Sequence, residues 1–319
     1  MEGPLERRLR MEADRALRSG APAPFASGRD CFVHLMQRAL ERVSSCKIFR
    51  EWARRTALSS VFRHVSFAFK TLPSSFHGFR ILHLSDVHFN REFDVLDALV
   101  QSGRKLDADL CVITGDFQTG YEPEVEFTCN QLERLVTHIR APHGIYACLG
   151  NSDVYAFAES FEKLGVRLLV NESVEIQGES ESMWLVGVDD PACFRCDDLP
   201  RAVQGVPADG FKILLAHAPM LVDEAAAMGI DLYLCGHTHG GQICVPYYGT
   251  PIYCGSCPRR YARGKWRHQN LQGYTSAGLG TKPFIARFWC PPEVVVIELC
   301  EAGQATCEPM VPGGGGLDT

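Results

Sequence analysis

The chain contains no long apolar run. No uncharged apolar stretch approaches the roughly 18 residues that a helix needs to cross a bilayer. Arg7 and Arg8, near the first residue, are followed by no apolar segment, so we expect no secretory signal. These features predict a cytoplasmic protein, and they leave open a peripheral contact with the inner face of the membrane.

The chain also has no excess of positive charge. It carries 32 Lys and Arg against 38 Asp and Glu, which gives a formal net charge of −6. Binding to nucleic acid depends on basic side chains that neutralise phosphates, so we expect no nucleic-acid partner. The apolar fraction of 46% is typical of a globular protein with a substantial core.

No disulfide framework is expected, although the chain has 14 cysteines. They are scattered, and several, such as Cys111, lie within apolar runs, which is typical of buried thiols in a reducing compartment. Two C-x-x-C pairs stand apart, Cys193 with Cys196 and Cys254 with Cys257. They are either four ligands of one structural zinc ion or two loop pairs of reduced thiols.

The first 78 residues differ in character from the rest of the chain. Residues 1–30 are polar and contain Gly and Pro, which predicts a poorly ordered lead-in. Apolar residues recur at spacings of three and four over 31–62, so we expect an amphipathic helical extension over 31–78. Residues 32–70 carry eight basic and two acidic side chains, a local charge of +6. This extension either lies on an anionic membrane surface or packs on the main domain with its basic face in water.

Strand-like and helical segments alternate from residue 79 onward. We expect strands at 80–85, 109–114, 145–149, 183–188, 211–216, 231–235, 273–278 and 293–299, and helices near 92–103, 123–139, 155–164 and 220–228. Helices join the first three strands, as in βαβ units, whereas less helix between the later strands indicates an antiparallel portion. The pattern predicts an α/β domain over 79–300, followed by a Gly-rich, disordered tail over 301–319.

Five short segments end in residue types that bind metal ions, and each follows an expected strand. They are "LSDVH" (Asp86, His88), "TGDF" (Asp116), "LGNSD" (Asn151), "LAHAP" (His217) and "CGHTHGG" (His237, His239). In α/β proteins, functional side chains gather just past the carboxyl ends of strands. A lone D-x-H or H-x-H is a weak signal, but five such segments in succession predict one shared site.

These ligands indicate two divalent metal ions. Nitrogen and oxygen ligands without thiolate suit Mn²⁺, Fe or Zn²⁺ better than Ca²⁺ or Mg²⁺, and we expect Mn²⁺ first. Two ions that share a carboxylate can activate water and neutralise charge on a phosphoryl group. The sequence therefore predicts an enzyme that hydrolyses phosphate esters.

The succession D-x-H, G-D, G-N-x-D, H-x-P and G-H-x-H resembles the calcineurin-like metallophosphoesterase family over residues 79–300. The resemblance implies a four-layer αββα sandwich of two mixed β-sheets flanked by helices. It implies one metal site formed by Asp86, His88, Asp116 and His239, and a second formed by Asp116, Asn151, His217 and His237. It also implies that catalysis involves Asp116, Asn151, His217 and Ser152.

One segment departs from the family pattern. The family usually reads G-N-H-[DE], whereas this chain has Ser152 in place of the histidine. The family histidine commonly contacts the phosphate and assists the leaving group, but a serine cannot carry a proton near neutral pH. The change favours a substrate whose leaving group needs little protonation, such as a pyrophosphate, over an alkyl monoester.

Two later segments, "GHTHGGQI" and "SAGLGTKPFIARFWCPPEVVVIEL", resemble a narrower bacterial subgroup of membrane-associated phosphodiesterases. That subgroup includes the chlamydial-type UDP-2,3-diacylglucosamine hydrolase of lipid A synthesis. The resemblance implies a phosphate-ester small molecule or a lipid-linked nucleotide as substrate, with UDP-2,3-diacylglucosamine as the candidate. The alternatives are a general phosphodiesterase or phosphatase acting on small soluble substrates, and a non-catalytic scaffold on the same fold.

Two further features have open interpretations. Asp189 and Asp190 follow an expected strand, and they either orient ligand histidines or form a plain turn. Residues 243–270 are rich in Tyr, Arg and Lys and follow a ligand segment. They form either a substrate lid, with Arg259, Arg260 and Arg263 as phosphate ligands, or an ordinary basic loop.

Overall fold

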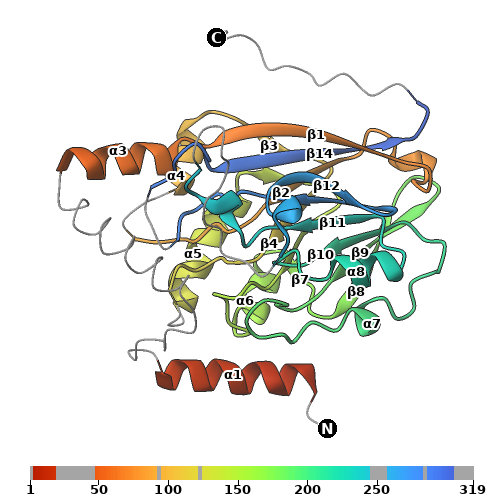
Figure 1. Cartoon of the computed structure of the whole chain (residues 1–319), viewed down its shortest axis with the longest axis horizontal. Helices are drawn as coiled ribbons and strands as arrows, with labels where there is room; N and C mark the ends of the chain where they lie inside the picture. The colour runs from red at the N-terminus through yellow and green to blue at the C-terminus, as the bar shows by residue number, and fades with distance from the viewer. Residues whose placement is uncertain are drawn as a thin grey trace.

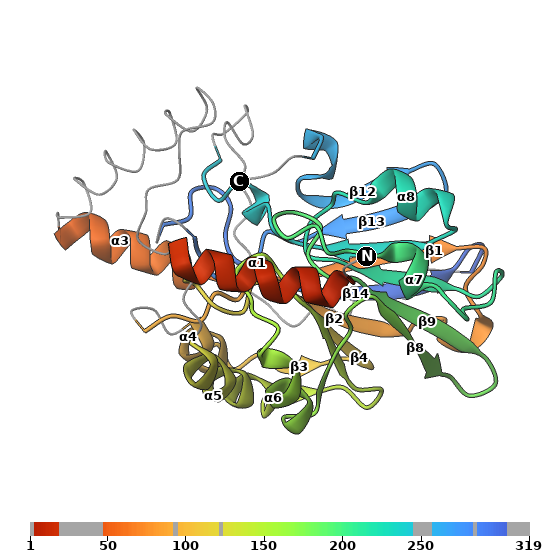
Figure 2. The same ribbon diagram turned by 90° about the horizontal axis from the view of Figure 1, so that it is seen from below.

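Two six-stranded β-sheets pack face to face at the centre of the protein, and helices cover both outer faces (Figures 1 and 2). The computed structural model describes residues 3–18, 47–91, 95–120, 124–244, 257–282 and 286–304. A buried cluster that includes Ile81, Leu110, Ile213 and Leu232 fills the space between the sheets. This arrangement confirms the predicted four-layer α/β sandwich.

The first sheet has the strand order β1-β14-β2-β4-β6-β7. These strands are β1 (Val61–Phe69), β14 (Glu293–Glu301), β2 (Arg80–Leu84), β4 (Leu110–Thr114), β6 (Ile145–Cys148) and β7 (Val166–Leu168). The strands from β2 to β7 are parallel neighbours, whereas β14 is antiparallel to β2 and parallel to β1. The outer face is covered by α4 (Val95–Gln101), α5 (Val125–Val136) and α6 (Phe157–Lys163). Because side chains alternate along a strand, Leu82 and Leu84 pack with these helices while Ile81 packs between the sheets.

The second sheet has the order β12-β13-β11-β10-β9-β8. These strands are β12 (Gly264–His268), β13 (Leu271–Thr275), β11 (Leu232–Cys235), β10 (Lys212–Leu215), β9 (Ser182–Gly187) and β8 (Glu172–Gln177). Its outer face is covered by α7 (Leu199–Ala202) and α8 (Val222–Ala227). In this sheet β8 and β12 run antiparallel to their neighbours, and with β14 of the first sheet they form the predicted antiparallel portion among the later strands. A separate pair of short strands, β3 (Leu106–Asp107) and β5 (Ile139–Arg140), lies outside both sheets.

The eight predicted strands correspond to β2, β4, β6, β9, β10, β11, β13 and β14, and the four predicted helices to α4, α5, α6 and α8. Central strands such as β4 and β10 are buried along their whole length. Strands that are buried on both faces appear as short continuous apolar runs, which is why the sequence identified them.

The prediction of a helical extension over 31–78 is only partly correct. Residues 47–58 form α3 (Lys47–Leu58), but residues 61–69 form β1, which pairs with β14 from Val61 to Phe69. The side chains of Phe67 and Phe69 are buried between the sheets. A strand that completes a sheet buries these aromatic rings, so tertiary pairing overrides the local helical pattern. The domain therefore begins before residue 79, and residues 31–46 lie outside the described part of the chain.

The prediction of a poorly ordered lead-in over 1–30 is wrong for α1 (Pro4–Arg18). This helix contacts the main domain through charged side chains, whose partners lie far away in the sequence and cannot be identified locally. Residues 19–30 and 305–319, and with them most of the expected tail, fall outside the described residues. Within the described ranges, no helix combines the length and the apolar character needed to traverse a bilayer.

Candidate metal centre

The seven predicted ligands come from loops at the carboxyl ends of strands in both sheets. Asp86 and His88 follow β2, Asp116 follows β4, and Asn151 follows β6, while His217 follows β10 and His237 and His239 follow β11. Because β2, β4 and β6 are parallel neighbours, and β10 and β11 are too, each sheet presents its ligands at one edge. Six of the seven side chains are buried, and His237 is half-buried.

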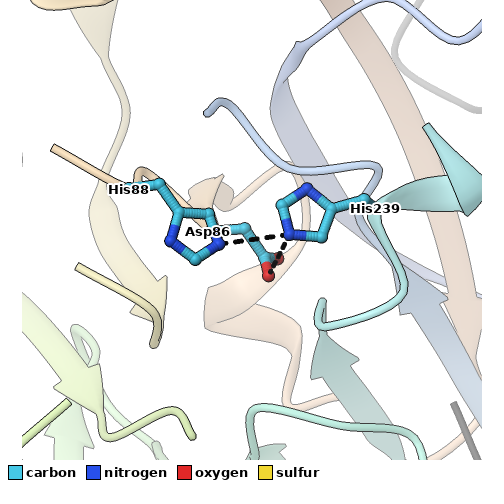
Figure 3. Close-up of side chains that lie close together, drawn as sticks. All are labelled: Asp86, His88 and His239. Carbon is cyan, nitrogen blue, oxygen red and sulfur yellow. Dashed lines mark hydrogen bonds and ion pairs between the residues drawn. The ribbon is translucent and has the colours of Figure 1, made fainter. Parts of the chain in front are cut away.

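One group of ligand atoms is formed by Asp86, His88 and His239 (Figure 3). The Nε2 atoms of His88 and His239 lie 3.2 Å apart, and the two rings are stacked. Asp86 Oδ1 lies 3.4 Å from His239 Nε2. The two rings and the carboxylate therefore direct their ligand atoms toward one small space.

A second group surrounds His217. Its Nε2 atom lies 3.1 Å from Asn151 Oδ1 and 3.2 Å from His237 Nδ1. Asp116 lies between the two groups, because its Oδ1 is 3.5 Å from His217 Nε2 and its Oδ2 is 3.4 Å from His88 Nε2. One carboxylate thus offers a separate oxygen to each group, as the sharing of Asp116 requires.

The hydrogen bonds of two histidines define which ring nitrogen faces the site. His88 Nδ1 lies 2.9 Å from the carbonyl oxygen of Gln118, and His217 Nδ1 lies 2.8 Å from that of Thr114. A carbonyl only accepts, so each Nδ1 donates, and a neutral ring then directs the lone pair of Nε2 into the site. Lone pairs, amide oxygen and carboxylate oxygens converge there, and a set of acceptors of this kind fits divalent cations.

The pKa values of two site histidines also indicate a site for positive charge. Burial by itself lowers the pKa of His217, but the carboxylates of Asp116 and Asp86 outweigh it and raise that pKa to about 10. His88, for which burial dominates, has its pKa lowered to about 4. The carboxylates are therefore placed to hold positive charge at the centre of the site, where metal ions would supply it.

Five of the seven candidate ligands have a backbone conformation that is uncommon for residues with side chains. Positive φ angles occur at Asp86 (48°), His88 (46°), Asp116 (57°), His237 (69°) and His239 (52°). Each costs roughly 1 kcal/mol and persists only where the surrounding structure enforces it. The shared geometry turns the D-x-H and H-x-H pairs out of the extended path of their strands, at the strand ends where the candidate ligands meet.

Two side chains of the loop Gly150–Asp153 bind it to Asp116, namely Ser152, a predicted site residue, and Asp153, to which the sequence analysis gave no role. The carboxylate of Asp153 accepts hydrogen bonds from the amides of Asp116 (2.7 Å), Phe117 (2.8 Å) and Gly150 (2.7 Å). The amide and the hydroxyl of Ser152 donate to the two carboxylate oxygens of Asp116, at 2.7 and 3.0 Å. The aspartate of "LGNSD" therefore acts as a structural anchor of the loop.

Lys282 is a second residue that the sequence did not identify. Its ammonium group donates to the hydroxyl of Ser152 at 2.6 Å, and its backbone amide donates to Gln242 Oε1 at 3.1 Å. The lysine thus brings a positive charge to the position where the family has a histidine. Its place in "GLGTKPF", between two glycines and a proline, was the only local signal.

The other expected features lie away from the ligands. Asp190 accepts hydrogen bonds from the amides of Ala192, Cys193 and Phe194, which corresponds to the turn alternative, while Asp189 pairs with Arg8 of α1. Arg259 and Arg260 are exposed, and no hydrogen bond in the described part of the chain joins either to the seven candidate ligands. Residues 245–256, including Cys254, lie outside the described residues, so the question of a zinc site stays open.

A family model described as calcineurin-like phosphoesterase matches residues 79–241. The chain belongs to the calcineurin-like phosphoesterase family. It is 27% identical to phosphodiesterase YaeI of Escherichia coli, over 69% of this chain and 82% of that protein. The uncharacterized metallophosphoesterase YkoQ of Bacillus subtilis is 29% identical, over 67% of this chain and 81% of YkoQ. The uncharacterized protein YpbG of the same organism is 30% identical, over 69% of this chain and 80% of YpbG.

As a calcineurin-like phosphoesterase, the protein is a hydrolase of phosphate esters. Its Asp and His clusters are the groups able to hold the divalent metal ions on which such a hydrolase depends. The predictions of family, of enzyme class and of a metal-dependent phosphoesterase are thereby confirmed.

Proposed function

We propose that the protein is a two-metal phosphodiesterase or pyrophosphatase. The observation that carries this proposal is the position of Asp116, whose two carboxylate oxygens lie 3.5 Å from His217 and 3.4 Å from His88. The first ion would be held by Asp86, His88, Asp116 and His239, and the second by Asp116, Asn151, His217 and His237. When bound, the two ions supply an activated water molecule and positive charge for the phosphoryl group.

We propose Mn²⁺ as the metal, with Fe or Zn²⁺ as alternatives. The described ligand atoms are imidazole nitrogens and carboxylate or amide oxygens, and no thiolate belongs to the two described groups. This set suits those ions better than Mg²⁺, which prefers oxygen ligands alone.

Ser152 and Lys282 together favour a leaving group that departs as an anion. The serine hydroxyl cannot supply a proton near neutral pH, but the ammonium group 2.6 Å from it can stabilise negative charge on the departing oxygen. A nucleotide phosphate released from a pyrophosphate is such an anion. Together with the resemblance to the bacterial membrane-associated subgroup, this supports UDP-2,3-diacylglucosamine as the candidate substrate.

A membrane contact on the cytoplasmic side would suit a substrate with acyl chains. The side chain of Trp52 in α3 contacts Phe288, with ring centroids 4.4 Å apart, and Ile48 and Trp289 are 82% and 71% exposed. Helix α3 also carries the exposed arginines Arg50, Arg54 and Arg55. Exposed apolar side chains on and beside a helix that carries arginines support binding to anionic lipid.

The membrane contact is tested by flotation with vesicles that contain anionic lipid. We expect the wild-type protein to float, and the double variant Ile48→Glu, Trp289→Ser to stay in the dense fractions. Equal flotation of the two proteins would contradict the proposal.

The catalytic proposal is tested by hydrolysis of bis-p-nitrophenyl phosphate, p-nitrophenyl phosphate and UDP-2,3-diacylglucosamine in the presence of Mn²⁺. We expect the wild type to cleave the diester and the pyrophosphate faster than the monoester, and Asp116→Ala to be inactive. Activity on the soluble diester alone would favour a general phosphodiesterase. A protein inactive on all three compounds with any of the three metals would favour the non-catalytic scaffold.

A further inference from the structure

Helix α1 packs against the loop Gly150–Asp153, which carries Asn151, although the two segments are far apart in the sequence. Three charged residues of this helix, Arg8, Glu12 and Arg15, are spaced by four and three positions and so lie on one helical face. In Figure 2, α1 crosses in front of the sheets. The contacts of these three side chains show what this face holds.

Arg8 is fully buried, which is unusual for an arginine and requires that its charge be compensated. Its Nη1 donates to Asp189 Oδ1 at 2.8 Å and its Nε donates to Glu12 Oε1 at 2.6 Å. Its Nη2 donates to the carbonyl oxygens of Asp153, at 2.7 Å, and Gly150, at 3.4 Å. The guanidinium group therefore joins α1, the segment after β9 and both ends of the Gly150–Asp153 loop.

The two other residues of this face extend the contact along the loop. Glu12 Oε1 also accepts a hydrogen bond from the amide of Tyr155 at 2.9 Å. Arg15 Nη1 donates to the carbonyl oxygen of Asn151 at 2.5 Å. The guanidinium carbon of Arg8 lies 3.6 Å from the ring centroid of Phe194, and that of Arg15 lies 5.3 Å from it. Side chains of α1 thus hold the backbone of the loop from Gly150 to Tyr155.

The loop is held between α1 on one side and Asp116 on the other. Its carbonyl groups face the arginines of α1, whereas the amide and hydroxyl of Ser152 face the carboxylate of Asp116. Between these two attachments, the side chain of Asn151 reaches to 3.1 Å from His217 Nε2. A displacement of α1 would therefore move Asn151 and leave the group of Asp86, His88 and His239 in place.

We propose that α1 is a strap for one half of the metal centre, and that Arg8 is the positioning residue that holds Asn151 in place for the second ion. This inference rests on the proposed function. It extends that proposal, because it makes an N-terminal helix outside the family match part of the metal site. It also predicts an asymmetry, since Asn151 lies in the loop that α1 holds, whereas the first ion has only its shared ligand Asp116 bonded to that loop in the described part of the chain.

The test measures Mn²⁺ bound per chain at graded free Mn²⁺ by equilibrium dialysis of the full chain. The variants are Arg8→Met, Arg8→Lys and, as a matched control, Arg7→Met, which removes an exposed arginine one position earlier on the same helix. We expect two bound ions in the wild type and in Arg7→Met. In Arg8→Met one ion binds as in the wild type, and the other binds at least about tenfold more weakly.

Arg8→Lys and one further variant, Asn151→Ala, distinguish a local effect on the second ion from a loss of folding. Arg8→Lys retains a positive charge beside Asp189 but loses the several N–H donors of the guanidinium group. This variant should therefore fold, and it should bind the second ion more weakly than the wild type but more tightly than Arg8→Met does. Asn151→Ala should reproduce the pattern of Arg8→Met, and combining the two substitutions should weaken the second ion no further than Asn151→Ala alone.

The outcomes separate this inference from the proposed function. Unchanged binding of both ions in Arg8→Met and Arg8→Lys would overturn the strap, and so would equal weakening of both ions, which indicates a general loss of stability. A wild-type protein that binds fewer than two ions would instead contradict the two-metal function itself.

Discussion

At the scale of single residues, Lys282 is the side chain for which we predict the most direct effect on specificity. Its ammonium group contacts Ser152, the residue that replaces the family histidine, and Ser152 in turn contacts Asp116. A positive charge at this position can stabilise a departing anion without transferring a proton. The structure thus places an ammonium group beside Ser152, where the sequence indicated only the loss of the family histidine.

We predict that Lys282→Met lowers kcat/KM by about 100-fold for diesters with poor leaving groups, in line with the loss of one electrostatic contact to a transition state. Esters with good leaving groups should lose much less, because their departing oxygen needs little stabilisation. The measurement is kcat/KM over a series of aryl phosphodiesters of rising leaving-group pKa. Lys163→Met, which removes an exposed lysine paired with Glu159, is the control. Equal losses across the series would contradict the prediction.

A second residue-scale prediction concerns pH and His83. Burial lowers the pKa of this histidine from 6.5 to about 3, and its Nε2 contacts the hydroxyl of Thr114 at 2.9 Å. Below pH 6.5 the unfolded chain binds a proton at His83 that the folded chain does not, so stability falls as the pH falls. Relative to His83→Gln, the wild type should lose about 2 kcal/mol of unfolding free energy between pH 7.5 and pH 5.

Urea unfolding of both proteins at the two pH values measures this difference. Other buried histidines titrate in both proteins and cancel in the comparison. A difference that does not change with pH would show that His83 is not held neutral by burial.

At the scale of elements, β1 is the strand whose role was least visible in the sequence. It pairs with β14 over nine residue pairs, from Val61 opposite Glu293 to Phe69 opposite Glu301. Phe67 and Phe69 belong to the cluster between the sheets. Without β1, the hydrogen-bonding edge of β14 would be open to solvent and to other chains.

We therefore predict different outcomes for two truncations. A chain that begins at residue 59 retains β1 and should unfold cooperatively, although it lacks α1 and α3. A chain that begins at residue 70 loses β1 and with it two buried phenylalanines. It should aggregate, because the backbone of β14 is then left without its partner strand and can pair with other chains. Size-exclusion chromatography and thermal unfolding by circular dichroism measure the outcome. Equal behaviour of the two chains would mean that β1 is dispensable.

At the scale of the whole molecule, the metal centre joins the two sheets. Asp86, His88, Asp116 and Asn151 come from the first sheet, whereas His217, His237 and His239 come from the second. Ions bound between them would hold the sheets together and bind only the folded chain. Their binding energy should therefore appear as stability.

We predict that Mn²⁺ at 100 times its dissociation constant stabilises the protein by about 2.7 kcal/mol for each ion, and that EDTA abolishes the effect. Thermal unfolding at rising Mn²⁺ concentration measures the shift. Asp116→Ala, which lacks the shared ligand, should show a much smaller shift. A wild-type protein with the same melting temperature in Mn²⁺ and in EDTA would contradict a metal centre between the sheets.

The sequence by itself determined the central strands of both sheets, four of the helices, and the identity of the seven candidate ligands. Strands buried on both faces are continuous apolar runs, and a strand followed by D-x-H or H-x-H delivers its ligands to a known edge. These are local properties of the chain. They suffice for the family and for the class of reaction.

Only the tertiary structure decided the role of residues whose partners are distant in sequence. Arg8 and Lys282 reach the Gly150–Asp153 loop from opposite ends of the chain, and β1 becomes a strand because β14 lies beside it. A buried arginine looks the same in the sequence as an exposed one, and burial arises only when the whole chain has folded. The periphery of this site therefore depends on long-range contacts, whereas its ligands follow from short local patterns.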